Sequence, residues 1–439
     1  MISTMPRPMT RTDRITGAVL AVVAVLAVSG CSRDSAAGGD GTRQTTSTTA
    51  AGEGGRVGRI PGVRRDGATY RVPDAVPDAA DAVPGALVAA SDEGPSKLMG
   101  QANRSVVLYR SSDAAGRPTT VSGTVLVPPG PPPAGGWPVI SWGHGTVGVA
   151  ARCAPSATDN LFYNEYAQEA RSFVAAGYAV VATDYPGLGT PGPHPYLDGV
   201  GEGNAVVDIV TAAHQLVVDL APDWFAVGHS QGGQAVLFAS RVAAERAPAL
   251  PLRATIAIAP ASHLELLLPT VIAGGSPADY VYALYALAGI AAVDPSVDLG
   301  SLLGPEGRSR LPLIIDDGCL LDTYDEFKAV PADGTFAVSD ERLTALSDDL
   351  ARIGNPDTAP TVGPVLVVQG ATDADVPAPL SAEMAQRLQA TGSDVTYREY
   401  PDRNHDQVLG PSMCDQLAFL AEHGGPPVTD CTPEPTDLS

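Results

Sequence analysis

One short motif constrains the fold of this chain most: the sequence Gly-His-Ser-Gln-Gly around Ser230. A mostly apolar, strand-like run precedes the motif, and a run with helical spacing begins at Gln231. A serine on such a sharp strand-to-helix turn has its hydroxyl exposed, and Gly228 and Gly232 are small because strand and helix approach closely there. With 47 glycines in the chain the motif alone is a weak signal. The prediction that Ser230 is a nucleophile therefore rests on the strand-like run before the motif and the helix-like run after it.

Strand-like and helix-like segments alternate along most of the chain, which predicts an α/β fold with a mostly parallel central sheet. The alternation stops between residues 262 and 361, where helices and loops predict an inserted cap. Within it, residues 278–293 are almost wholly apolar and predict a core helix of the cap, with one face available to line an apolar substrate pocket or touch a lipid interface. Residues 61–95 are rich in Pro, Asp and Ala, and we expect them to form an arm along the surface.

The N-terminus has the pattern of an export signal. Three arginines precede an apolar run at residues 17–28, and small residues lead to Cys31. This ending resembles the bacterial lipobox, so residues 1–30 are predicted to be a lipoprotein-type signal peptide that is removed before lipidation of Cys31. An ordinary cleaved signal is the alternative. Residues 31–60 are rich in Gly, Ser and Thr and predict a flexible tether. The protein is thus expected to be exported, and either lipid-anchored at the outer face of the cell membrane or secreted.

Four further cysteines remain in the exported part of the chain. An even number outside the cytoplasm favours two disulfides, and the sequence permits three pairings. We predict the local pair Cys414–Cys431, which leaves Cys153–Cys319. The net charge of −22 argues against nucleic acid as a partner, because phosphate binding needs excess Lys and Arg. No cysteine or histidine spacing indicates a metal site.

A serine nucleophile needs a base and an orienting carboxylate, and both follow Ser230 in the chain. Asp373 lies directly after the strand-like run at 365–369, and His405 lies directly after the last predicted strand. Ligand and catalytic groups gather at the carboxyl ends of parallel strands, so the three are expected to meet. Asp375 in the same loop is the alternative acid. The other six histidines are interpreted as structural.

The oxyanion of a tetrahedral intermediate needs two N–H donors. One is expected to be the backbone N–H of Gln231, which points the same way as the serine oxygen. The second should come from the loop after the strand at 137–142, where Thr146 is the first candidate and Gly145 the next. Residues 187–192 match the glycine pattern of dinucleotide sites. Such a site needs a helix whose N-terminus binds the pyrophosphate, and the prolines in this region exclude that helix. No cofactor is therefore expected.

Several sequence blocks together are more specific than the serine motif alone. The chain resembles the secretory lipase family of α/β-hydrolases, the Candida antarctica lipase A type, over roughly residues 70–431. The blocks that carry the resemblance are Tyr-Arg-Ser at 109–111, Ser-Gly-Thr-Val-Leu-Val-Pro at 122–128, Ser-Trp-Gly-His-Gly-Thr at 141–146, Cys-Ala-Pro-Ser at 153–156, Asp-Tyr-Pro-Gly-Leu-Gly at 184–189, His-Pro-Tyr-Leu-Asp-Gly at 194–199 and Gly-His-Ser-Gln-Gly-Gly at 228–233.

The resemblance implies hydrolysis of carboxylic esters, including acylglycerols, with Ser230 as nucleophile, Asp373 as acid and His405 as base. The resemblance also implies two disulfides. The cap is the variable part of the family, so acyl-chain preference does not carry over. The protein is expected to be an exported, monomeric lipase or esterase, with its catalytic domain at residues 61–439. A short-chain esterase or deacetylase and a peptidase are alternatives on the same fold, and a surface binder without catalysis is a third.

Overall fold

The computed structural model describes residues 60–72 and 83–438. The predicted signal peptide, Cys31 and nearly all of the predicted tether lie outside the described residues. Within the described ranges, no helix has the length and apolar character needed to cross a membrane.

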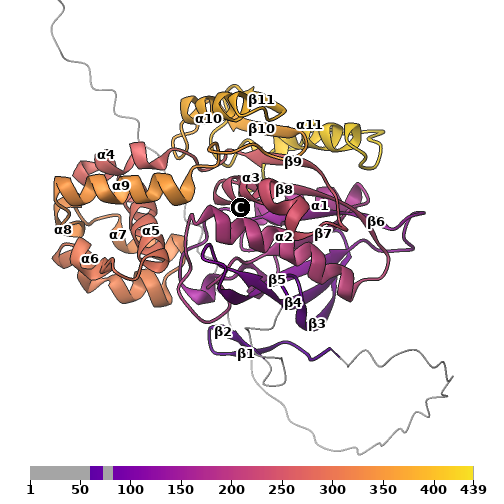
Figure 1. Ribbon diagram of the computed structural model, residues 1–439, viewed down its shortest axis with the longest axis horizontal. Helices are drawn as coiled ribbons and strands as arrows, with labels where there is room; N and C mark the ends of the chain where they lie inside the picture. The colour runs from indigo at the N-terminus through magenta and orange to yellow at the C-terminus, as the bar shows by residue number, and fades with distance from the viewer. Residues whose placement is uncertain (1–59, 73–82, 439) are drawn as a thin grey trace, which may run out of the picture. The chain divides into compact units, whose positions relative to one another are not determined.

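A nine-stranded sheet forms the centre of the described chain (Figure 1). The strand order is β11-β10-β9-β8-β6-β7-β5-β4-β3. All pairs from β7 to β11 are parallel, whereas β5 pairs antiparallel with β7 and the three strands at the other edge are antiparallel to one another. The predicted α/β fold with a mostly parallel sheet is confirmed. The strands are β3 (Leu87–Ser96), β4 (Ala102–Ser112), β5 (Pro118–Val127), β6 (Trp137–Gly143), β7 (Ala179–Thr183), β8 (Leu220–His229), β9 (Leu252–Ile258), β10 (Val365–Gly370) and β11 (Val395–Tyr400).

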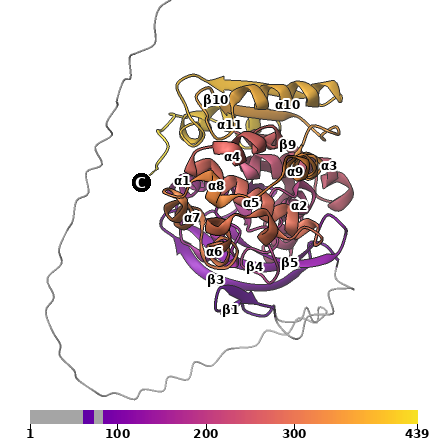
Figure 2. The same cartoon turned by 90° about the vertical axis from the view of Figure 1, so that its left-hand side faces the viewer.

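Helices cover both faces of the sheet, which explains why its central strands are apolar on both sides. Along β10, Val365 and Val367 pack in one buried cluster, and Leu366 and Val368 pack in another. The first cluster includes residues of α2 (Gly199–Leu216), α3 (Gln231–Arg246) and α10 (Ala378–Ala390), and the second includes residues of α1 (Asn164–Ala175) and α11 (Leu409–Glu422). Figure 2 shows these layers from the side.

The chain between β9 and β10 consists mainly of helices with their own apolar cluster. The central helix α5 begins with a capping box of Ser276 and Asp279, and its almost wholly apolar sequence is buried on most sides, as predicted. Tyr280 and Tyr285 are buried, whereas Tyr282 is partly exposed. The cap helices are α4 (Leu268–Gly274), α5 (Pro277–Val293), α6 (Pro305–Ser309), α7 (Leu320–Phe327), α8 (Ala332–Thr335) and α9 (Asp340–Gly354).

The segment expected to form a surface arm is partly a strand, so that expectation was wrong for its last residues. A short hairpin of β1 (Arg64–Asp66) and β2 (Thr69–Arg71) comes first, and β3 then forms the edge of the main sheet beside β4. The sequence of β3 is polar in its second half because an edge strand is held by backbone bonds on one side only and exposes much of its surface.

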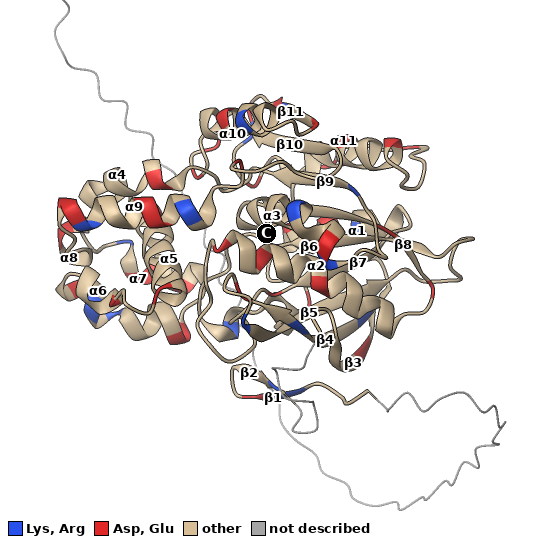
Figure 3. Cartoon of the chain, viewed as in Figure 1, with Lys and Arg blue, Asp and Glu red and all other residues tan. Residues whose placement is uncertain are grey.

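Two disulfides join the pairs predicted from the sequence. Cys153 and Cys319 connect a loop beside the sheet to the start of α7, and Cys414 and Cys431 connect α11 to the C-terminal segment. Asp and Glu residues are spread over the cap helices and over the helices beside the sheet (Figure 3). This distribution fits a solvated acidic surface.

Candidate active site

Ser230 lies on the turn between β8 and α3 with φ 58° and ψ −118°. Positive φ is costly for a residue with a side chain, so the surrounding structure must hold it. The Ser230 N–H donates to the Ile258 carbonyl at 2.8 Å, and the Ser230 carbonyl accepts from the N–H of Ala261 at 3.0 Å. The predicted strained turn is present. Two backbone hydrogen bonds hold it, one to strand β9 and one to a residue just after β9.

Two glycines of the motif are required by close backbone contacts. A Cβ on Gly232 would lie 1.9 Å from the carbonyl oxygen of Gly143, at the end of β6. A Cβ on Gly228 would lie 2.3 Å from the carbonyl oxygen of Gly232. The first turn of α3 therefore rests directly on the ends of β6 and β8, as the sequence predicted.

Asp373 holds His405 in one orientation. The Nδ1 atom of His405 lies 2.8 Å from Oδ2 of Asp373, which also accepts a hydrogen bond from Nε2 of Gln369 at 2.8 Å. The other carboxylate oxygen of Asp373 accepts the N–H groups of Asp375 and Val376, both at 2.9 Å. With its Nδ1 proton bound to the carboxylate, His405 has Nε2 available to accept a proton from a serine.

The pKa values of the neighbouring carboxyl groups of Asp373 and Asp375 are shifted in opposite directions. Burial raises the pKa of Asp373, but its hydrogen bonds and the charge of His405 outweigh that effect, so the net direction is down. Burial raises the pKa of Asp375, and the charge of His405 lowers it less, so the net direction is up. The structure places Asp373, and not Asp375, in contact with the imidazole.

Several carboxylates raise the pKa of His405. Burial lowers its pKa, but the hydrogen bond and charge of Asp373, together with the charges of Asp406 and Asp375, raise it to about 9. The imidazolium form is thus stabilised, as is required of a base that becomes positively charged during the reaction.

His229 has a structural role beside the site, as the sequence suggested. Its Nε2–H donates to the carbonyl oxygen of His405 at 3.1 Å, and its Nδ1 lies 3.1 Å from the hydroxyl of Tyr166. Burial lowers the pKa of His229 to about 4, so the ring is neutral at pH 7. Tyr166 and Gln369 were not predicted, because a tyrosine in a helix and a glutamine in a strand do not by themselves indicate a role.

The two candidates for the second oxyanion donor differ in their contacts. The N–H of Gly145 donates to the Tyr166 hydroxyl at 3.0 Å and is therefore occupied. Thr146 lines the same two cavities as Ser230, and its hydroxyl is 2.7 Å from that of Tyr196. The Tyr166 contact thus favours Thr146 over Gly145 as the second donor, beside the first candidate Gln231.

Two cavities of different character meet at Ser230 and His405. One has a volume of about 90 Å³ and extends under the cap, where mostly apolar side chains of α4, α5 and α9 line it. The other has a volume of about 530 Å³ and is lined in part by Asn160, Glu165 and Asp406. Both cavities are lined by Thr146, Ser230, Tyr282 and His405 but differ in the rest of their lining, so two parts of one substrate can be bound separately. The apolar lining is Leu264, Leu267, Leu268, Val271, Ala283, Ala286 and Leu350.

Potential metal ligands also gather here. Among the described residues, one group, His229, His405 and Asp406, has ligand atoms within 4.8 Å of one another. Both ring nitrogens of His229 and the Nδ1 of His405 already take part in hydrogen bonds. These residues therefore fit a hydrogen-bonded serine site better than a metal centre.

Comparison with known proteins agrees with this geometry. The family model described as serine aminopeptidase, S33, matches residues 162–410, which include Ser230, Asp373 and His405. No curated protein sequence matches the chain.

Solved structures resemble the chain in fold at low sequence identity. Candida antarctica lipase A in its closed state is 18% identical with a TM-score of 0.67, covering 83% of this chain and 88% of that one. The rice cell wall degrading esterase LipA from Xanthomonas oryzae is 22% identical with a TM-score of 0.64, covering 78% and 100%. A putative hydrolase from Legionella pneumophila is 19% identical with a TM-score of 0.66, covering 78% and 100%. The expected α/β-hydrolase fold of the lipase A type is confirmed.

Proposed function

The chain belongs to the family of serine hydrolases described as serine aminopeptidase, S33, and from that premise we propose that it hydrolyses carboxylic esters through an acyl-enzyme. The observation that carries the proposal is the arrangement around Ser230. The strained turn exposes this serine to two cavities that His405 also lines, and Asp373 holds the imidazole from behind at 2.8 Å.

In the proposed reaction, the oxygen of Ser230 attacks the ester carbonyl while His405 Nε2 takes the serine proton. The negative charge on the former carbonyl oxygen is stabilised by the N–H groups of Gln231 and Thr146. His405 then gives its proton to the leaving alcohol oxygen as the ester C–O bond breaks. Water, deprotonated by the same imidazole, attacks the acyl-enzyme and releases the acid and the free serine.

The two cavities support an assignment of the substrate's parts. The apolar cavity under the cap suits the acyl chain, and the second cavity, whose lining has polar side chains among apolar ones, suits the alcohol. A cavity of about 90 Å³ is small compared with ligand pockets, which are typically about 300–1,000 Å³. We therefore expect the cap in this arrangement to accept short acyl groups directly, and longer chains, including those of acylglycerols, to need displacement of the cap helices.

Export is part of the proposal. The signal-like N-terminus supports it, and so do the two disulfides, which form and persist in oxidising compartments. Lipidation of Cys31 would hold the enzyme at the outer face of the cell membrane. The acidic net charge fits a neutral or lipid substrate rather than nucleic acid. The enzyme is proposed to act as a monomer.

Hydrolysis of p-nitrophenyl esters from acetate to palmitate by the purified protein tests the proposal. We expect turnover that disappears in Ser230→Ala while the circular dichroism spectrum is unchanged. Activity confined to acetate and butyrate would identify a short-chain esterase or deacetylase. Equal turnover by wild type and Ser230→Ala would refute the nucleophile, and a folded wild type without activity on any ester would favour a binding protein.

An aminopeptidase is the second candidate, because two carboxylates line the mostly apolar cavity under the cap. Asp279 and Asp375 lie there, and neither Lys nor Arg is among its lining residues. A carboxylate beside an acyl site suits the ammonium group of a peptide N-terminus. Aminoacyl p-nitroanilides test this function: release of nitroaniline at a higher kcat/KM than that of any ester would replace the esterase proposal.

A further inference from the structure

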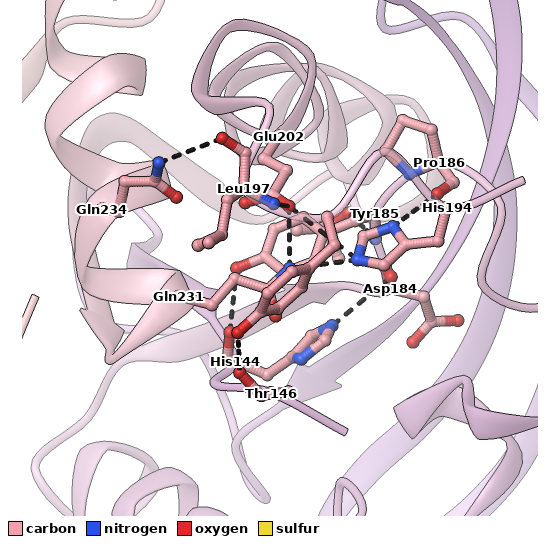
Figure 4. Close-up of polar contacts among 12 residues, drawn as sticks. His144, Thr146, Asp184, Tyr185, Pro186, His194, Leu197, Glu202, Gln231 and Gln234 are labelled. Carbon is pink, nitrogen blue, oxygen red and sulfur yellow. Dashed lines mark hydrogen bonds and ion pairs between the residues drawn. The ribbon is translucent and has the colours of Figure 1, made fainter. Parts of the chain in front are cut away.

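The side chain of Gln231 lies in a buried polar group and lines neither cavity at Ser230, although its backbone N–H is the proposed oxyanion donor. Its Nε2 atom donates to Oε1 of Glu202 at 2.7 Å and lies 3.0 Å from Nε2 of His194 (Figure 4). All three side chains are almost completely buried. The two N–H bonds of this amide therefore have one partner each.

The hydrogen positions in this group follow from its partners. The Nδ1 atom of His194 lies 2.9 Å from the Pro186 carbonyl oxygen, which can only accept, so Nδ1 carries the proton and Nε2 accepts from Gln231. Burial lowers the pKa of His194 to about 3, in agreement with a neutral ring. Burial also raises the pKa of Glu202 well above its usual value.

Glu202 keeps one oxygen without a partner. Its Oε1 accepts from both Gln231 and the N–H of Leu197, whereas Oε2 is buried and has no hydrogen bond among the described residues. An unsatisfied buried polar atom costs free energy, typically about 1–3 kcal/mol. The two hydrogen bonds accepted by Oε1 are therefore what holds the Glu202 side chain in this group.

One loop reaches both proposed donors of the oxyanion hole. Residues 194–198 contribute His194 and the Leu197 N–H to the Gln231 group, and the Tyr196 hydroxyl of the same loop contacts the Thr146 hydroxyl at 2.7 Å. The cap packs against this loop as well, since a Cβ on Gly289 of α5 would lie 2.1 Å from the Tyr196 carbonyl oxygen. The loop is thus held between the donors and the cap.

We propose that Glu202 and His194 are positioning residues, which hold the Gln231 side chain so that its backbone N–H is aimed at the oxyanion. The inference rests on the proposed function, because it needs Ser230 to form a tetrahedral intermediate. The anchoring is specific to the transition state: it changes how well the developing oxyanion is stabilised and leaves ground-state binding of the ester almost unchanged.

Four variants test the proposal through kcat and KM separately. Gln231→Met keeps the backbone N–H and the side-chain length but removes both side-chain hydrogen bonds, those to Glu202 and His194. Glu202→Ala removes one of the two. We expect kcat to fall at least tenfold in each, less than the hundred- to thousandfold typical of a lost donor, with KM changed less than twofold. Glu202→Gln retains an acceptor for both N–H groups and should keep most of the wild-type kcat. The double variant should be little slower than the slower single one, since both act through one contact.

A second buried pair of the same chemistry provides the control. Gln416 Nε2 lies 3.4 Å from Oε2 of Glu169, and burial raises the pKa of that carboxyl to about 8. Neither residue lines the two cavities at Ser230. Glu169→Ala and Gln416→Met should lower the melting temperature and leave kcat per active site unchanged. Equal kcat losses in the two sets, or wild-type kcat in Gln231→Met and Glu202→Ala, would overturn the inference.

Labelling by a fluorophosphonate separates this inference from the proposed substrate class. Its phosphoryl oxygen occupies the same hole when Ser230 is modified, and titration with it counts functional sites where a variant folds poorly. Slower labelling of Gln231→Met, with Glu202→Gln near wild type, supports positioning even if no ester is hydrolysed. A wild-type protein that is neither labelled nor active would refute both proposals.

Discussion

His405 is surrounded by more negative charge than one orienting carboxylate supplies. Asp373 binds its Nδ1, and the charges of Asp406 and Asp375 also raise its pKa, to about 9 against the opposing effect of burial. At the residue scale, this predicts how the proposed reaction depends on pH. A base must be neutral to accept the serine proton, so acid pH inactivates the free enzyme by protonating His405.

We expect kcat/KM of the wild type to rise with pH through the His405 pKa, so that the ascending limb lies above pH 6.5, the usual pKa of histidine. Asp406→Asn removes a negative charge, lowers the pKa of His405 and should move this limb to lower pH. A pH–rate profile on a short p-nitrophenyl ester measures the shift. Asp348→Asn, at an exposed position of α9, is the control and should leave the limb in place. A limb that moves to higher pH in Asp406→Asn would contradict the electrostatic account.

At the scale of the element, α4 and α5 line much of the proposed acyl site. The capping box fixes the start of α5, and its apolar surface serves two purposes: most of it packs in the cap, and Tyr282, Ala283 and Ala286 line the cavity at Ser230. Val271 of α4, which is only half-buried, belongs to the same cavity wall. Small changes at this wall are therefore expected to alter substrate length at modest cost in stability.

Val271→Ala removes two methyl groups from the cavity wall and should shift preference toward longer acyl chains. Each further methylene that becomes buried contributes about 0.8 kcal/mol, or about fourfold in kcat/KM. We expect the hexanoate-to-butyrate ratio of kcat/KM to rise by about that factor. Val242→Ala, the same substitution on α3 at the main apolar core, is the matched control. An unchanged ratio in Val271→Ala would remove this cavity as the acyl site.

At the scale of the whole molecule, the two disulfides bridge very different lengths of chain. Cys153 and Cys319 are 166 residues apart and connect the sheet side to the cap, whereas Cys414 and Cys431 are 17 residues apart. A cross-link that closes a longer loop removes more conformational entropy from the unfolded chain. The long-range bridge is therefore expected to contribute more to stability.

Replacing both members of the Cys153–Cys319 pair by Ser should lower the free energy of unfolding by about 5 kcal/mol, against about 3 kcal/mol for the Cys414–Cys431 pair. Urea unfolding of the two double variants measures the difference. Because the first bridge also ties α7 of the cap to the core, its loss should raise the relative activity on long acyl esters. A larger loss of stability from the short-range pair would refute the loop-length argument.

Local patterns were sufficient to predict most of the architecture. Apolar periodicity located the central strands and the cap helix α5, because a segment buried on both sides has few alternatives. The turn at Ser230 was predictable because it needs Gly228 and Gly232 beside the serine, and both contacts are backbone contacts independent of side-chain detail. The edge strand β3 was missed because its pairing with β4, and not its own side chains, holds it in the sheet.

The chain by itself determined the α/β class, the order of Ser230, Asp373 and His405, and a short set of disulfide pairings. Only the tertiary structure decided between near neighbours in sequence. It brought Asp373 rather than Asp375 to an imidazole 32 residues away, and it occupied the Gly145 N–H with Tyr166. The anchoring of Gln231 by Glu202, across 29 residues, had no sequence signal at all. Periodicity records whether a position is buried, whereas the partner of a buried polar group depends on which distant segments the fold brings together.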